Sequence, residues 1–230
     1  MTRILALDTS TEACSAAVIA DGKTFVEFDV CPREHNKRIL AMTDSVLTQA
    51  NLKLADVDVI AYGQGPGSFT GVRIATGIVQ GLALGADKAT VGVSSLRAMA
   101  HSIFRTSGQT HIISAIDARM NEIYLGAFII EEQGSVQTVI QDTVCDARNS
   151  LKALDSQIVW QAIGTGWQTY HAELSQQINA QVNTQCTFPN ALDIALIGLK
   201  KFSEGDQQSA AQVSPVYVRD QVTWKKLPGK

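Results

Sequence analysis

The glycine-rich segment at residues 63–71, GQGPGSFTG, carries the most specific arrangement of reactive side chains in the sequence. Ser68 lies between Gly67 and Gly71, and a serine in a strand–loop–helix setting can act as a nucleophile of the G-x-S-x-G type. Ser68 lies one position too early for that motif, however, and it suits a helix N-cap, whose hydroxyl accepts a hydrogen bond from the first turn. We interpret Ser68 as the cap, and no catalytic residue is predicted.

The same segment has the features of an anion-binding loop. Gly63, Gly65 and Gly67 permit a tight loop that Pro66 stiffens, and the helix after it exposes N–H groups at its start. Arg73 falls in or near the first helical turn, where a cation opposes the helix dipole. That position favours a dedicated carboxylate or other anionic partner for Arg73, with solvent as the alternative. The residues of this motif loop are Gly65, Pro66, Gly67, Ser68, Phe69, Thr70, Gly71 and Arg73.

Two further turns carry a carboxylate and can be compared with the phosphate-binding turns of two-lobed ATPases, in which the first hairpin of each lobe faces the nucleotide phosphates. The first, Asp8-Thr9-Ser10, has hydroxyls but no glycine, and the second contains Asp117 and Arg119 with bulky neighbours and again no glycine. Backbone N–H groups wrap a phosphate only where side chains leave room for it. We therefore interpret both turns as vestigial phosphate loops, and intact ATPase chemistry is not predicted.

The metal-binding residue types are dispersed. The four histidines and four cysteines are His35, His101, His111, His171, Cys14, Cys31, Cys145 and Cys186. They form no H-x-x-x-H, H-E-x-x-H or C-x-x-C pattern, so neither a metal site nor a disulfide framework is predicted. His35, at the head of a predicted helix, is interpreted as a solvated residue.

The predicted elements that position these residues repeat in order. The first half gives strands at 3–9, 14–20 and 24–30, a helix at 35–50, a strand at 57–62 and a helix at 69–86. The second half gives strands at 111–117, 122–131 and 135–144, a helix at 147–154, a strand at 158–163, and helices at 167–178 and 190–203. Asp21-Gly22 is a strong hairpin signal.

Two successive βββαβα units predict an α/β fold of the actin-like ATPase superfamily (ASKHA, ribonuclease H-like), with two lobes that face a cleft. We expect an N-terminal lobe at residues 1–105, completed by the C-terminal segment 206–230, and a C-terminal lobe at 106–205.

The helix at 69–86 carries Gly77, Gly81 and Gly85, spaced four residues apart. Residues at i and i+4 share one helical face, so the three form a stripe without side chains. Each glycine costs roughly 1 kcal/mol relative to alanine in a helix. The stripe therefore indicates that something packs closely on it: the protein's own sheet, its own 35–50 helix, or a helix of a partner.

Composition narrows the functional classes. The chain has 230 residues, a formal net charge of −3 and 45% hydrophobic residues, and its pI is near 5.8. Proteins that bind nucleic acid unaided usually present a basic face, so this chain is not expected to hold RNA by itself. The start, MTRILALDTSTEACS, is not expected to be a signal peptide, and no stretch is expected to reach the roughly 18 apolar residues of a membrane span. We expect a cytoplasmic protein.

Four segments together resemble the TsaB (YeaZ) family, and the likeness covers essentially the whole chain. They are ILALDTSTEACSAAV, GQGPGSFTGVRIA, AIDARMNEIYLGAF and PVYVRDQVTWKKLPGK, the last of which is similar to the gammaproteobacterial form. The resemblance implies a subunit needed to make threonylcarbamoyladenosine on tRNAs that read ANN codons. It also implies that this subunit is a degenerate, non-catalytic paralogue of TsaD, the subunit that transfers the threonylcarbamoyl group.

The resemblance implies partners as well. Family members pair with TsaD through the first two helices of lobe one, the ATPase TsaE joins them, and the protein forms a homodimer when alone. ATP and metal are expected on the partner subunits, and tRNA is contacted only indirectly. TsaD binds metal through two histidines on its early helix, and only His35 stands near that place here. The metal site is therefore not carried over.

The partner helices correspond to residues 33–50 and 68–86, which contain the glycine stripe. The expected interface residues, for TsaD or for a second copy, are Ile39, Met42, Thr43, Val46, Ile74, Gly77, Ile78, Gly81 and Gly85. Two other functions are weighed against this one. The first is a peptidase that cleaves the TsaD paralogue with Ser68, and the second is an independent nucleotide-binding protein.

Overall fold

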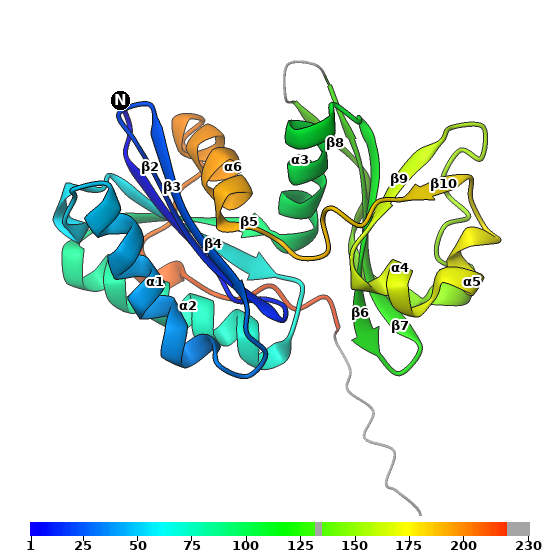
Figure 1. The fold of residues 1–230 in the computed structure, drawn as a ribbon, viewed down its shortest axis with the longest axis horizontal. Coiled ribbons are helices and arrows are strands. Elements are labelled where there is room, and N and C mark those ends of the chain that lie inside the picture. The colour runs from blue at the N-terminus through cyan, green and yellow to red at the C-terminus, as the bar shows by residue number, and fades with distance from the viewer. Residues whose placement is uncertain (132–134, 220–230) are drawn as a thin grey trace, which may run out of the picture.

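Two five-stranded β-sheets lie side by side in the computed structural model, which describes residues 1–131 and 135–219 (Figure 1). The first sheet has the order β3-β2-β1-β4-β5 and the second β10-β9-β6-β7-β8. In each sheet three antiparallel strands are followed by parallel ones. This repeated mixed topology is that of the actin-like ATPase fold, as predicted.

The first sheet forms lobe one. Its strands are β1 (Ile4–Asp8), β2 (Ala13–Ala20), β3 (Lys23–Val30), β4 (Val59–Gly65) and β5 (Ala89–Ser94). Every residue of β1 is buried, because helices cover both faces of the sheet. Such a strand reads as a continuous apolar run rather than as an alternating pattern. The hairpin predicted at Asp21-Gly22 is confirmed, with φ values of 51° and 77°.

The helices of lobe one lie in two layers (Figure 1). They are α1 (His35–Gln49), α2 (Phe69–Ala86) and α6 (Ala191–Ser203), with short 3₁₀ turns at Leu54–Asp56 and Ala210–Gln212. α1 and α2 pack on one face of the sheet, and α6 packs against β1, β2 and β4 on the other.

The second sheet forms lobe two. Its strands are β6 (His111–Arg119), β7 (Glu122–Ile130), β8 (Val136–Asp146), β9 (Trp160–Ile163) and β10 (Ala180–Val182). Its helical segments are α3 (Ser95–Ser107), a 3₁₀ turn at Ala147–Asn149, α4 (Thr165–Thr169) and α5 (His171–Ser175). The prediction missed β5, α3 and β10. The helix predicted at 147–154 is only the 3₁₀ turn, and the helix predicted at 167–178 is two short helices that meet at Tyr170.

The two halves of the chain exchange helices. α3 belongs to the first half of the sequence but packs on β6 and β7, whereas α6 follows lobe two in sequence and packs on the first sheet. Gly198 of α6 faces β4 so closely that a Cβ there would lie 2.8 Å from the Cβ of Ala61. The expected boundary at residue 205 therefore has to be corrected, because it separates α6 from the sheet that α6 covers.

The C-terminal segment returns to the first sheet. Thr90 and Gln208 exchange backbone hydrogen bonds, each 2.8 Å long, and the Val216 N–H donates to the Gln64 carbonyl at 2.8 Å. The segment then runs toward the base of lobe two (Figure 1). The part of the prediction that concerns residues 220–230 lies outside the described residues.

The composition of α2 contradicts the expectation that no stretch approaches the length and apolarity of a membrane span. Its 18 residues have a mean hydropathy of 1.2, which is long and apolar enough for a membrane span by length and composition alone. In the structure Val72, Ala75, Val79 and Ala83 of this helix are buried, and α2 packs on β4. The helix is apolar because one face covers the sheet and the opposite face carries glycines in place of polar side chains.

Candidate functional site

The first vestigial phosphate turn is closed to solvent. Asp8, Thr9 and Ser10 are each 0% exposed. The Ser10 N–H and hydroxyl both donate to Asp8 Oδ1 at 3.1 Å, and the Thr9 hydroxyl donates to the Gly71 carbonyl at 2.7 Å. The Ser95 hydroxyl, at the start of α3, donates to Ser10 Oγ at 2.9 Å. The hydroxyls of this turn therefore bond to the protein itself.

The motif loop is what closes that turn. The Ser68 N–H donates to the Ser10 carbonyl at 2.7 Å. A Cβ on Gly67 would lie 2.2 Å from the Ser10 carbonyl oxygen, and a Cβ on Gly71 would lie 2.1 Å from that of Thr9. These glycines therefore permit close packing of two loops of the same chain. The anion-binding interpretation of the loop finds no support at this turn.

Burial changes the acidity of the Asp8 carboxyl. Desolvation raises its pKa to about 7, although the two hydrogen bonds from Ser10 act in the opposite direction. Its Oδ2 atom is buried without a hydrogen-bond partner. That atom lies where a Cβ on Gly63 would approach it to 1.8 Å. A carboxyl that is enclosed in this way, and whose ionisation is disfavoured by burial, is poorly suited to organise a metal or an attacking water.

The second vestigial turn is open but occupied by its own side chains. Asp117 Oδ1 accepts hydrogen bonds from the Arg119 N–H at 2.8 Å and from the Tyr170 hydroxyl at 3.3 Å. The Arg119 side chain is 76% exposed and lies 3.5 Å from Asp117 and 3.9 Å from Glu12 of the first turn. The two vestigial loops thus face each other across the lobes, with Arg119 between their carboxylates.

Ser68 is the N-cap of α2, as predicted. Its hydroxyl accepts a hydrogen bond from the Gly71 N–H at 3.4 Å. Among the hydrogen bonds of residues 1–131 and 135–219, none joins Ser68 to a histidine. His35 was expected to be solvated, but it is buried at 8% exposure, because α1 begins against the sheet. In the described part of the chain no three His, Cys, Asp or Glu side chains are grouped to hold a metal ion.

The predicted interface residues of α1 fall into two groups. Ile39 and Val46 are 0% exposed and Thr43 is 4% exposed, so these three face the protein's own core and cannot contact a partner directly. The reason is that spacings of three and four residues also define the face by which α1 covers the sheet. Met42 is partly buried and packs at the edge of that core.

The predicted interface residues of α2 lie differently. Ile74 and Ile78 are partly buried at the edge of the core, whereas Gly77, Gly81 and Gly85 are exposed. At each of these glycines a Cβ would meet no atom within 4 Å among those described. Neither the protein's own sheet nor α1 packs on the stripe. Within the described residues the stripe is therefore exposed, and neither of the two occupants expected from the chain itself covers it.

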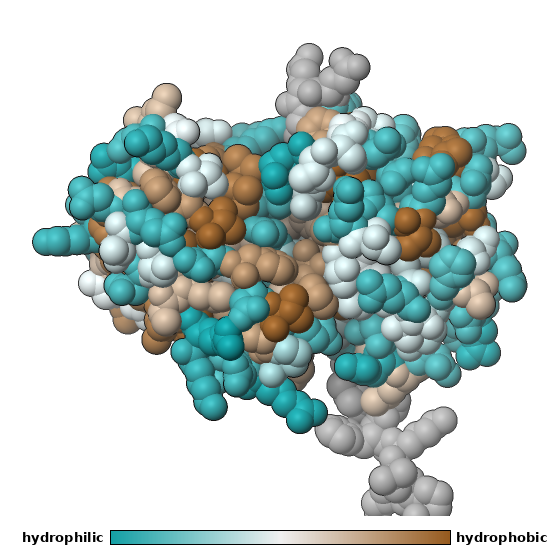
Figure 2. Space-filling view, in the orientation of Figure 1, coloured by the Kyte–Doolittle hydropathy of each residue, from teal (hydrophilic) through white to brown (hydrophobic). Residues whose placement is uncertain are grey.

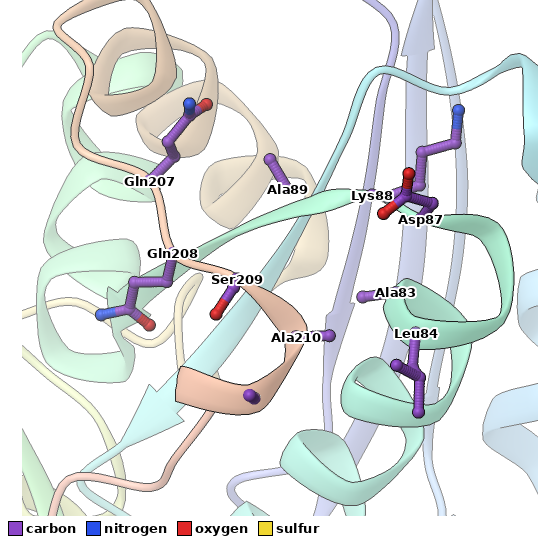
Figure 3. Close-up of a pocket in the computed structure, with 10 residues that line it drawn as sticks. Ala83, Leu84, Asp87, Lys88, Ala89, Gln207, Gln208, Ser209 and Ala210 are labelled. Carbon is purple, nitrogen blue, oxygen red and sulfur yellow. The ribbon is translucent and has the colours of Figure 1, made fainter.

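Large apolar side chains are exposed on α1 and α2, and two of them, Leu84 and Leu40, were not among the residues predicted from sequence. Leu84 of α2 is 75% exposed, Phe69 is 67% exposed, and Leu40 of α1 is 52% exposed. A shallow cavity of about 530 Å³ lies at the C-terminal end of α2, between Leu84 and residues 207–211 (Figure 3). On the face of the molecule in Figure 2, apolar residues form patches separated by hydrophilic ones. Leu84 could have been identified from the sequence, because it occupies a position of the helix at which the helical periodicity predicts a polar residue.

Arg73 contacts aromatic rings rather than a carboxylate. Its guanidinium carbon lies 3.3 Å from the centre of the Phe69 ring and 4.7 Å from that of the Tyr217 ring. Nη1 donates to the Phe69 carbonyl at 2.9 Å. No described carboxylate lies within ion-pair distance of Arg73, so the predicted anionic partner is not found within the described chain.

Comparisons with known proteins relate the chain to TsaD and, over its whole length, to TsaB (YeaZ) proteins. Residues 29–225 match the family described as TsaD, tRNA N6-adenosine threonylcarbamoyltransferase. The chain is 42% identical over 234 aligned positions to the tRNA threonylcarbamoyladenosine biosynthesis protein TsaB of Escherichia coli K12, with 99% of each chain covered. It is 38% identical to the TsaB protein of Haemophilus influenzae over 99% of this chain and 98% of that one. The solved structure of YeaZ from Pseudomonas aeruginosa superposes with a TM-score of 0.88 at 37% identity, covering 94% of this chain and 100% of that one.

Proposed function

The chain belongs to the TsaB (YeaZ) family, which gives it a role in tRNA threonylcarbamoyladenosine biosynthesis, and from this premise we propose that it acts there as a non-catalytic partner of the TsaD transferase. The tRNAs concerned are those that read ANN codons. In this proposal the chain acts in the cytoplasm, contacts tRNA only through its partners, and leaves ATP and metal to them.

The observation that carries the proposal is the exposed outer face of α2. Three glycines at intervals of four, with no described atom within 4 Å of any of their Cβ positions, provide a flat strip of helix backbone. Leu84 lies exposed beside it. An isolated helix would gain roughly 1 kcal/mol at each position from alanine. A strip of glycines lacks this gain in helix stability but remains apolar and flat. Such a strip is suited to the close approach of a partner helix.

The partner in this proposal is a helix of TsaD, and a second copy of the chain uses the same face when TsaD is absent. The TsaE ATPase joins the resulting heterodimer. The residues proposed for direct contact differ from the set expected from sequence: the buried Ile39, Thr43 and Val46 are left out, and the exposed Leu40 and Leu84 are added. The proposed contact residues are Leu40, Met42, Ile74, Gly77, Ile78, Gly81, Leu84 and Gly85.

The absence of catalysis by this chain is supported by three features already described. The first phosphate turn is covered by the motif loop, the Asp8 carboxyl is enclosed, and the Ser68 hydroxyl serves as a helix cap. A peptidase acting on TsaD would need a base beside Ser68, and no described contact supplies one.

Reconstitution of the modification tests the proposal. Threonylcarbamoyladenosine should form on a tRNA that reads ANN codons only when this chain is added to TsaD, TsaE and the enzyme that makes threonylcarbamoyl-adenylate. The chain alone should neither hydrolyse ATP nor modify tRNA. Full modification without the chain would contradict the proposal. Cleavage of TsaD that stops in a Ser68→Ala variant would establish the peptidase instead.

A further inference from the structure

A cavity of about 700 Å³ lies beside the start of α2 and has walls from both lobes. Phe69, Val72 and Arg73 of α2 form one side, and Tyr124 of β7 forms part of the other. The C-terminal segment closes it with residues 216–219. The volume lies within the range of pockets that bind ligands or partner side chains. None of the described lining residues belongs to either vestigial phosphate turn.

Two guanidinium groups line the cavity, and only one of them is neutralised. Arg219 donates to the Ala118 carbonyl at 3.1 Å and forms an ion pair with Glu122. Arg73 forms no ion pair with any carboxylate in the described ranges, 1–131 and 135–219. The described cavity wall therefore carries one net positive charge, located at Arg73.

The Arg73 guanidinium is held in place by its neighbours. Phe69 and Tyr217, whose ring centres are 6.2 Å apart, both lie against it, and the Phe69 carbonyl accepts one of its N–H groups. A guanidinium has five N–H donors, and stacking on aromatic faces leaves those at its edge available. Phe69 is 67% exposed and Tyr217 is 47% exposed. Exposed aromatic residues around a fixed arginine are characteristic of the central contacts of protein interfaces.

We propose that this cavity receives an acidic side chain of the partner protein, which pairs with Arg73. The inference rests on the proposed function, because Arg73 lies four residues before Gly77 and so on the same helical face as the stripe. A helix on that face reaches the cavity mouth. The aromatic walls accept the apolar part of such a side chain, and the planar guanidinium accepts its carboxylate in a bidentate pair. An RNA backbone suits the site less, since Arg73 and Arg219 are the only lysine or arginine side chains among the cavity's described lining residues.

The test is the affinity of the full chain for purified TsaD, measured by titration calorimetry. Arg73→Gln should weaken binding by about tenfold or more, the range of charge-assisted hydrogen bonds. Arg73→Lys should recover little of this loss, because lysine keeps the charge but cannot form the planar pair. Wild-type affinity should fall with added salt more steeply than that of Arg73→Gln. The matched control is Arg148→Gln, which removes an exposed cation in lobe two and should bind as wild type does.

The outcomes separate this inference from the proposed function. If Gly81→Leu weakens TsaD binding while Arg73→Gln does not, the acidic contact is wrong and the helix face stands. If both variants bind as wild type does, both are overturned. If Arg73→Gln lowers the affinity of the assembled complex for tRNA but not that of the chain for TsaD, the cavity binds RNA and the inference is overturned. Circular dichroism of each variant shows that the fold is intact before its affinity is compared.

Discussion

Gly67 and Gly71 of the motif loop and Gly77 and Gly81 on the outer face of α2 are close in sequence but have opposite surroundings. At Gly67 and Gly71 a Cβ would lie within 2.2 Å of a backbone carbonyl oxygen, whereas at Gly77 and Gly81 it would meet nothing within 4 Å. The first pair holds two loops of one chain together, and the second pair leaves a surface bare. A glycine in a sequence therefore does not reveal whether the close neighbour belongs to the same molecule or to another.

The comparison also separates the phosphate turn that this fold has closed from the helix surface that it exposes. The packed glycines close a turn that carries the vestigial phosphate residues, and the bare glycines lie on the outer layer of the same lobe. The proposed binding of TsaD depends on the exposed glycines, whereas the stability of the chain depends on the packed ones. Four substitutions test this division, beginning with the largest expected effect.

Gly71→Ala should be the most damaging. Its methyl group would lie 2.1 Å from the Thr9 carbonyl oxygen, which belongs to the backbone and cannot rotate away. Overpacking costs about 3 kcal/mol at the upper end of its usual range, and this contact is closer than those that real cores tolerate. Urea unfolding followed by circular dichroism measures the loss. A variant as stable as wild type would show that the turn is not packed as described.

Asp8→Asn should change how stability depends on pH. The folded-state pKa of Asp8 is about 7, above the ordinary aspartate value of 3.8. The folded protein therefore holds a proton that the unfolded chain has released between these values, and the free energy of unfolding falls as pH rises from about 4 to about 7. The fall attributable to Asp8 is on the order of 4 kcal/mol, because the pKa rises from 3.8 to about 7 and one pKa unit corresponds to about 1.4 kcal/mol.

The measurement is the difference between wild type and Asp8→Asn in urea unfolding across this pH range. Subtraction is needed because other carboxyls titrate too. Burial raises the pKa of Asp193, but hydrogen bonds from His101 and Arg105 outweigh that and lower it, so its contribution to stability is lost at acidic pH instead. Equal pH profiles for the two proteins would contradict a raised pKa at Asp8.

Gly81→Leu should leave the fold intact and weaken TsaD binding. The side chain enters open space within the chain but blocks the approach of a partner helix, at a cost of about 2 kcal/mol, or roughly thirtyfold in affinity. Size-exclusion chromatography and calorimetry with TsaD measure it. Ala172→Leu, on the exposed surface of α5 in lobe two, adds similar bulk elsewhere and serves as the control. Unchanged affinity for Gly81→Leu would show that another face binds the partner.

Gly77→Ala has the smallest expected effect, and its sign is opposite to that of Gly71→Ala. A Cβ at Gly77 meets nothing within 4 Å, so the substitution should stabilise the isolated chain by about 0.5–1 kcal/mol through helix propensity alone. Urea unfolding of the purified chain measures this gain. A loss of stability would indicate a contact on this face that the structure lacks.

Much of the fold could be predicted from local patterns. The Asp21-Gly22 hairpin, the Ser68 cap and most strands follow from turn chemistry and from short apolar runs. α3 was missed although Ser94 caps it and Gly108 ends it in the left-handed conformation. The exchange of α3 and α6 between the lobes could not be predicted, because helical periodicity gives the width of an apolar face but not the sheet it covers.

The features of the candidate site can likewise be divided into those that the sequence predicts and those that depend on the tertiary structure. The sequence by itself determined the family, the absence of glycine in both phosphate turns, and a stripe on α2 that required an explanation. Only the tertiary structure decided that Ile39, Thr43 and Val46 face inward, that the stripe is bare, and that Arg73 lies between two aromatic rings. Spacing along a helix specifies which residues share a face, whereas the direction of that face depends on contacts between segments far apart in the chain.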